Sequence, residues 1–159
     1  MKTLAAIATA AAIAFATPSH ADFAPLSFLS SLVGGQPHVV AKVSIAQQTM
    51  DLTVVDGHGQ PTTYTWKVST GRTGFETPTG AFKPTWTDID HTSDTYDNAP
   101  MPFAVFFTGG YAVHATEYVK HLGKPASHGC VRLLTENAKT FFKLVENYGM
   151  GATLISVVD

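Results

Sequence analysis

The chain has a single cysteine, Cys130, in the stretch PASHGCVRL at residues 125–133. The nucleophilic form of a cysteine is the thiolate, a minor species at neutral pH because a free thiol has a pKa of about 8.5. A histidine that is close in space can accept the proton and activate the sulfur. His128 stands two residues before the cysteine, and His114 ends an apolar stretch further upstream. These residue types indicate a cysteine nucleophile and leave the choice of base open.

Three neighbours of Cys130 suit the same chemistry. Gly129 permits a tight turn and a close approach of substrate, and consecutive N–H groups around it can face a developing oxyanion. Arg132 would share the cysteine's side of an extended segment, where it could bind a carboxylate or raise the local positive potential. Ser127 is interpreted as a turn residue rather than a second nucleophile. A single cysteine is more often a small buried apolar residue than a nucleophile. The interpretation of Cys130 as a nucleophile therefore rests on the cysteine together with its neighbours.

A zinc site is an alternative interpretation of the same residues. His114, His121 and His128 recur every seven residues, and Cys130 would add a soft ligand. Seven-residue spacing aligns side chains only on a helix, and the glycine and proline between His121 and His128 argue against a helix. We therefore expect no metal and no other cofactor.

The N-terminus predicts export. Residues 1–21 contain one lysine, an apolar alanine-rich run and small residues before a cleavage point after Ala21, which is the three-part form of a secretory signal peptide. The apolar run is shorter than the roughly 20 residues that span a bilayer. The processed protein is therefore expected to have no membrane span and to act in the periplasm or the cell wall.

Composition narrows the class of protein further. Apolar residues make up 45 % of the chain and charged residues 14 %, which is enough apolar material for one sizeable core. The formal charge of −2 and the absence of a Lys/Arg cluster argue against nucleic-acid binding. We expect a signal peptide at 1–21, an arm or linker at 22–37 and one domain at 38–159.

Most of that domain has the period-2 alternation of β-strands. Strands are predicted in residues 38–54, 64–68, 81–82, 101–115 and 152–158. Residues 85–100 are polar and irregular, and we predict a flap over a surface. One helix is predicted after Thr135, its expected N-cap, because Ala138, Phe141, Phe142 and Val145 have helical spacing. The expected fold is mainly β, a sandwich or barrel-like core with one helix packed near the C-terminus.

The motifs resemble the L,D-transpeptidase catalytic domain family, also called the YkuD type. The resemblance covers about residues 38–158. It rests on SHGCVRL at 127–133, with upstream matches STG at 69–71, TPTGAF at 77–82, APMP at 99–102 and GYAVH at 110–114.

This resemblance implies a YkuD-like domain that remodels bacterial peptidoglycan. Cys130 would attack the carbonyl of the third residue of a tetrapeptide stem, release D-alanine and form a thioester. An amine would then take the acyl group, by 3→3 cross-linking, lipoprotein attachment or D-amino acid exchange. The partners implied are peptidoglycan stem peptides and, in some relatives, an outer-membrane lipoprotein.

Residue roles follow from the same resemblance. His114 would be the general acid/base, oriented by the backbone carbonyl of Ala115, and its ion pair with Cys130 would give a thiol of low pKa. Many members have glycine where this chain has Ala115, and alanine would be strained if that position requires a positive φ. The other motif residues would shape the nucleophile loop and oxyanion site or bind the stem: Ser127, His128, Gly129 and Arg132.

Two other functions remain open on these residues. A hydrolase or amidase of the same family would pass the acyl group to water, acting on peptidoglycan or on lipoprotein–peptidoglycan links. A non-catalytic wall-binding module would keep the fold, although such a protein would usually lose the cysteine or its histidine.

Overall fold

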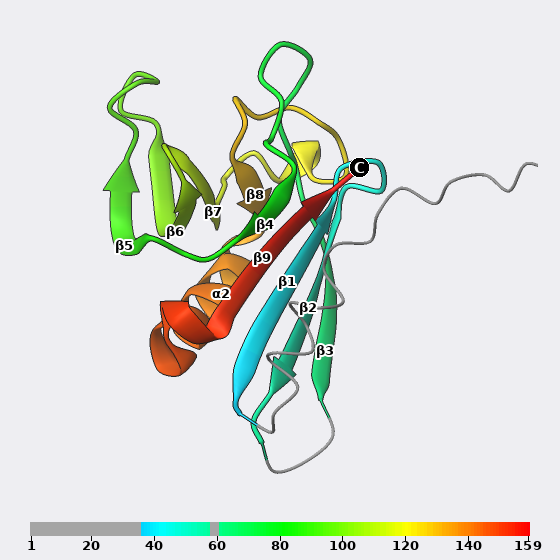
Figure 1. Ribbon diagram of the computed structural model, residues 1–159. Helices are drawn as coiled ribbons and strands as arrows, with labels where there is room; N and C mark the ends of the chain where they lie inside the picture. The colour runs from blue at the N-terminus through cyan, green and yellow to red at the C-terminus, as the bar shows by residue number, and fades with distance from the viewer. Residues whose placement is uncertain (1–35, 58–60) are drawn as a thin grey trace, which may run out of the picture.

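The computed structural model describes residues 36–57 and 61–159, which form two β-sheets and one α-helix (Figure 1). The predicted signal peptide at 1–21 and all but the end of the arm at 22–37 lie outside the described residues. The first sheet has the strand order β3-β2-β1-β9-β4. Its strands are β1 (His38–Ser44), β2 (Thr49–Val55), β3 (Thr62–Lys67), β4 (Gly80–Phe82) and β9 (Thr153–Val158).

The second sheet holds the motif residues. Its strands are β5 (Trp86–Thr92), β6 (Pro100–Thr108), β7 (Tyr111–Ala115) and β8 (Val131–Leu133), in that order across the sheet. β5, β6 and β7 pair antiparallel, whereas β8 runs parallel to β7. One face of this sheet packs against the helix and the first sheet. A separate small apolar cluster, with Cys130 packed against it, consists of Met101, Ala104, Phe106 and Ala112.

The helix α2 (Thr135–Tyr148) closes the core. Ala138, Phe141 and Val145 are buried, as their spacing predicts, and they join one apolar cluster with residues of both sheets. The predicted cap is wrong: Leu134 occupies the N-cap position, Thr135 is the first helical residue, and no side chain caps the helix. Two short 3-10 turns complete the described elements, η1 (Val119–His121) and η2 (Met150–Ala152).

The region predicted as an irregular flap is mostly a β-hairpin. Residues 86–92 form β5, which pairs with β6, so only residues 93–99 form the connecting loop. At its tip Asp97 and Asn98 both have positive φ, 53° and 51°, and the Ala99 N–H donates to the Tyr96 carbonyl at 2.9 Å. Two successive positive φ values define a type I′ turn, the turn that matches the twist of a hairpin. The flap is therefore an extension of the second sheet.

The predicted fold class is confirmed: the chain is mainly β, with two packed sheets and one helix near the C-terminus. Within residues 36–57 and 61–159, no helix has the length and apolar character needed to cross a membrane.

Candidate active site

The parallel pairing of β7 and β8 brings the two main motif residues together. Val113 pairs with Val131 and His114 with Arg132, so Cys130, just before β8, lies level with Ala112. His114 lies two residues further along β7, on the same face as Ala112. With a strand spacing of about 4.8 Å and a rise of about 3.3 Å per residue, the Cα atoms of Cys130 and His114 are about 8 Å apart. The thiol and the imidazole are therefore diagonal neighbours on one face.

The environment of His114 fixes the position of its proton. The side chain is 5 % exposed, and Nδ1 lies 2.7 Å from the carbonyl oxygen of Ala115. A carbonyl oxygen only accepts, so Nδ1 carries the hydrogen and Nε2 keeps a free lone pair. Burial lowers the pKa of His114 to about 4, against an opposing contribution from the Ala115 hydrogen bond. The ring is thus a neutral base at pH 7.

Cys130 is half-buried and does not have the low pKa expected from the sequence. Burial raises the pKa of its thiol, more than the Ala112 backbone N–H and the charge of Arg132 lower it. The prediction of a thiolate–imidazolium ion pair is therefore wrong for the free protein. A dry environment penalises both charged forms, so the resting pair is a neutral thiol beside a neutral imidazole.

Alkylation of Cys130 by iodoacetamide is expected to follow these pKa shifts. Because burial holds the pKa of the thiol above its ordinary value, the rate should rise with a midpoint above that of a free cysteine, which is about 8.5. The midpoint is measured by mass spectrometry of the protein alkylated for fixed times across a pH series. A rate that is already at its plateau at pH 6 would contradict the neutral pair and restore the ion pair.

The nucleophile loop is held by two buried hydroxyl groups. Ser127 donates to the Cys130 carbonyl at 2.6 Å and accepts from the Gly129 N–H at 3.0 Å, which agrees with its interpretation as a turn residue. Thr77 donates to the Gly129 carbonyl at 2.8 Å and accepts from the Gly71 N–H at 2.9 Å. In a trans peptide the C=O and N–H point in opposite directions. Anchoring the Gly129 carbonyl on Thr77 therefore turns the Cys130 N–H to the other side.

Gly129 is required by both conformation and space. Its φ is +112°, and an added Cβ would lie 2.3 Å from Cε1 of Tyr111. Gly129→Ala is therefore expected to lower the free energy of unfolding by about 2–4 kcal/mol, from backbone strain and overpacking together. Gly149→Ala is the matched control, since Gly149 has φ +87° but no atom within 4 Å of the added Cβ. Urea unfolding of both variants measures the difference, and equal losses would show that the Tyr111 contact is relaxed without penalty.

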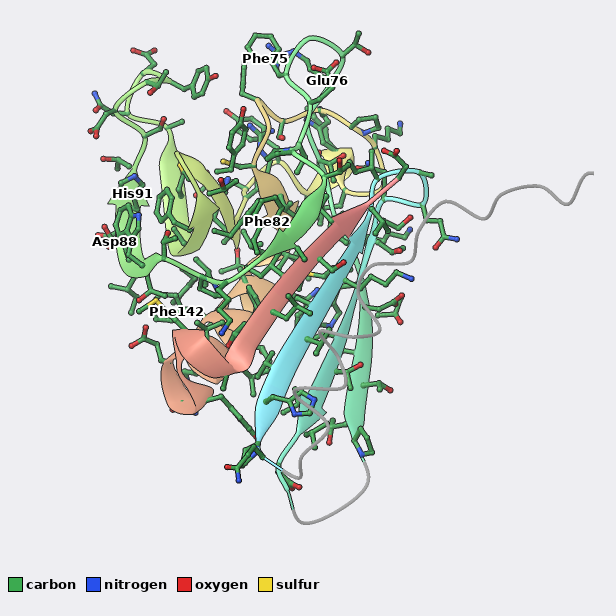
Figure 2. All side chains as sticks on the ribbon, in the orientation of Figure 1. Phe75, Glu76, Phe82, Asp88, His91 and Phe142 are labelled. Carbon is green, nitrogen blue, oxygen red and sulfur yellow. The ribbon has the colours of Figure 1, made fainter. Side chains whose placement is uncertain are left out.

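The contacts of His128 argue against its acting as the base. Its Nε2 lies 2.7 Å from Nη2 of Arg72, and because a guanidinium only donates, Nε2 is the acceptor. Its ring stacks on Tyr96 at a centroid distance of 4.4 Å and meets Phe75 edge-on at 4.9 Å. Figure 2 places Phe75 on the loop before β4. His128 thus joins that loop, the hairpin tip and the nucleophile loop.

A cleft of about 720 Å³ lies on this face, and five of the seven predicted site residues line it: His114, Ala115, His128, Cys130 and Arg132. The other two, Ser127 and Gly129, are buried within the nucleophile loop and do not line the cleft. Ser93 and residues 96–99 of the hairpin tip also line the cleft, together with residues 100–102 of β6, so part of the predicted flap forms a wall. Arg132 donates to the Ala126 carbonyl at 3.4 Å.

Sequence reasoning missed two contacts to the nucleophile loop and left the effect of Ala115 open. Arg72 and Thr77 contact the nucleophile loop from a distant part of the chain, and only the TPTG motif gave a signal for Thr77. Ala115 belongs to β7 and is not among the residues with positive φ, so replacing glycine there brings no backbone strain. In the part of the chain that the structure describes, no three His, Cys, Asp or Glu side chains are grouped to hold a metal ion.

Fold and site together define a β-rich domain whose thiol and imidazole share one cleft. The model of the L,D-transpeptidase catalytic domain, called YkuD, matches residues 38–157. The chain belongs to this family. A comparison with curated proteins gives no match.

Solved L,D-transpeptidases have the same fold. The enzyme from Stackebrandtia nassauensis is 27 % identical, with a TM-score of 0.63 over 77 % of this chain and 56 % of that chain. The enzyme from Mycobacterium smegmatis is 23 % identical, with a TM-score of 0.66 over 77 % and 59 %. L,D-transpeptidase 3 from Mycobacterium tuberculosis, in complex with a faropenem-derived adduct, is 24 % identical, with a TM-score of 0.60 over 77 % and 61 %. The matched region thus spans less than two thirds of each of these chains.

Proposed function

We propose that the protein is an exported cysteine L,D-transpeptidase of peptidoglycan, with its catalytic domain at residues 38–159 and its place of action in the periplasm or cell wall. Cys130 is the nucleophile and His114 the general acid/base. The observation that carries the proposal is that His114 on β7 and Cys130, the residue before the adjacent parallel strand β8, line one cleft, with the His114 proton held on Nδ1 by Ala115.

The first half-reaction forms a thioester. Nε2 of His114 takes the thiol proton as the sulfur of Cys130 attacks the carbonyl of the third stem residue, so neither charge exists before substrate is bound. The Cys130 N–H, turned away from Thr77, faces the developing oxyanion. The tetrahedral intermediate collapses, the C–N bond to D-alanine breaks, and His114 returns the proton to the leaving amine.

The second half-reaction transfers the acyl group to an amine. The acceptor amine attacks the thioester carbonyl and gives its proton to His114, and the C–S bond breaks. The proton then passes to the sulfur, which restores the neutral thiol. Arg132, half-buried in the cleft wall, supplies a positive charge for a stem carboxylate. The acceptor is the side-chain amine of another stem, a lipoprotein lysine or a D-amino acid.

The experiment that tests the proposal incubates the purified protein with a disaccharide-tetrapeptide and follows the products by mass spectrometry. Release of D-alanine together with a cross-linked dimer is expected. Release with only the tripeptide product would assign water as the acceptor and favour the hydrolase. Absence of release would contradict a tetrapeptide donor and favour the wall-binding module.

Covalent labelling is a second readout of the nucleophile. The related L,D-transpeptidase 3 was solved with a faropenem-derived adduct, and we expect faropenem to add to Cys130 here. Intact-mass spectrometry followed by peptide mapping locates the added mass. Labelling outside residues 125–133, or none, would contradict the assignment of Cys130.

A further inference from the structure

An exposed aromatic surface lies on β5, at the edge of the second sheet. The indole of Trp86 is 42 % exposed and lies flat on the buried ring of Phe106, at a centroid distance of 3.9 Å and an interplanar angle of 3°. The ring of His91 meets both edge-on, 5.3 Å from Trp86 and 5.0 Å from Phe106. The two neighbours hold the indole in one orientation, and 42 % of Trp86 is still exposed for contact with a ligand.

Polar groups border this ring. Nδ1 of His91 lies 3.2 Å from Oδ2 of Asp88, and both side chains are partly exposed. Figure 2 shows them beside each other on β5. We call Trp86, Asp88 and His91 the β5 platform. The Asp88 carboxylate accepts from the Asp90 N–H at 3.1 Å and lies beside His91, and each of its oxygens keeps a further lone pair that a polar ligand can use.

A sugar ring satisfies both kinds of surface. Its C–H groups carry a partial positive charge and stack on the negative face of an indole, while its hydroxyl groups can donate to a carboxylate and bond to an imidazole. The β5 platform therefore has the chemistry of a carbohydrate subsite.

The β5 platform and the cleft are continuous on one face of the sheet. Trp86 pairs with Phe106, and Phe106 pairs with Ala112. Cys130 packs against the small apolar cluster that contains Phe106 and Ala112. His91 pairs with Met101, which lines the cleft.

The spacing fits the substrate of the proposed function. Trp86 and Ala112 are two strands apart, which is about 10 Å, and the Cys130 sulfur lies a further hydrogen-bond length beyond the Ala112 N–H, so the sulfur is about 10–14 Å from Trp86. In a tetrapeptide stem, three residues separate the sugar from the carbonyl that is attacked. An extended chain spans about 3.3–3.6 Å per residue, or about 10 Å for three. A stem whose third carbonyl reaches the sulfur can thus place its sugar on the platform.

We propose that the β5 platform binds the glycan strand that carries the donor stem, with one sugar ring stacked on Trp86 and its hydroxyl groups on Asp88 and His91. This inference rests on the proposed function for the identity of the stem. It makes the protein selective for stems still attached to glycan over free peptides.

The kinetic test compares two donors in two variants. Trp86→Ala is expected to lower kcat/KM for a disaccharide-tetrapeptide about 3- to 10-fold, through KM, as the loss of one aromatic stacking contact implies. The same variant should leave kcat/KM for the free tetrapeptide unchanged. Tyr64→Ala is the matched control, because Tyr64 is an aromatic residue 38 % exposed on β3 of the other sheet, and it should change neither value. Equal losses on both donors, or no loss on either, would overturn the subsite.

A binding test separates this inference from the proposed reaction. Cys130→Ala protein is titrated calorimetrically with a peptide-free glycan oligomer, alone and combined with Trp86→Ala or Trp86→Phe. Binding that is weakened by Trp86→Ala and less by Trp86→Phe supports the subsite even if neither donor releases D-alanine, in which case only the proposed function fails. D-alanine release without glycan binding, or binding that is indifferent to Trp86, overturns the subsite and leaves the proposed function standing.

Discussion

Cys130→Ser is expected to abolish D-alanine release, with a fall of about 10⁴-fold or more, as for other enzymes that lose their nucleophile. The serine hydroxyl is nearly the size of the thiol but far less acidic. A base whose pKa is about 4 is too weak to activate an alcohol. The rate is measured by mass spectrometry of released D-alanine from a disaccharide-tetrapeptide.

The control for this variant is its stability. Ser127 and Thr77 hold the nucleophile loop through backbone carbonyls and N–H groups, so the loop does not depend on the thiol itself. The thermal midpoint of Cys130→Ser should therefore stay close to that of the parent protein. Turnover retained by a folded Cys130→Ser protein would remove Cys130 from the role of nucleophile.

His114→Ala should have the next largest effect, a loss of about 10²- to 10⁴-fold in kcat/KM, the usual contribution of a positioned acid/base. His128→Ala should lose less, because Nε2 of His128 already accepts from Arg72 and has no lone pair left for the thiol proton. Both variants are assayed for D-alanine release under the same conditions.

His121→Ala is the matched control for the two histidines, since His121 lines the same cleft and its ring stacks on Tyr118 outside the motif. It should keep most of the activity. A larger loss for His128→Ala than for His114→Ala would transfer the role of base to His128.

Most of the fold was predictable because strands and the helix with a buried face show a regular spacing of apolar residues in the sequence. Apolar residues alternate through β1, and Val39, Ala41 and Val43 are all fully buried. β5 was missed because its sequence WTDIDHT has no such alternation. As an edge strand, it has no fully buried residue in its burial pattern, so the period-2 signal that a core would impose is absent.

The sequence motifs predicted the residues of the site that belong to them, but not the contacts that other parts of the chain make with those residues. His114 lies on β7 and Cys130 directly before the neighbouring strand β8, and the carbonyl of Ala115 accepts from His114 as the resemblance implied, while their roles remain predictions. The Arg72 contact with His128 joins residues 56 positions apart, which sequence spacing cannot reveal. The pKa of Cys130 was mispredicted for a related reason, because a sequence lists neighbouring charges but not the loss of water around them.

The place of β9 in the first sheet makes the domain depend on a late part of the chain. β9 lies between β1 and β4 and pairs parallel with β1. Val39 in β1 therefore cannot complete this pairing until Thr153, its partner in β9, is present. Contacts so distant in sequence close slowly. A chain synthesised from its N-terminus has an incomplete first sheet until residues 153–158 are available to pair with β1. The last strand therefore completes the apolar core, in which Ile155 and Val157 join Val113 and Val131 beneath the sheet that carries the cleft.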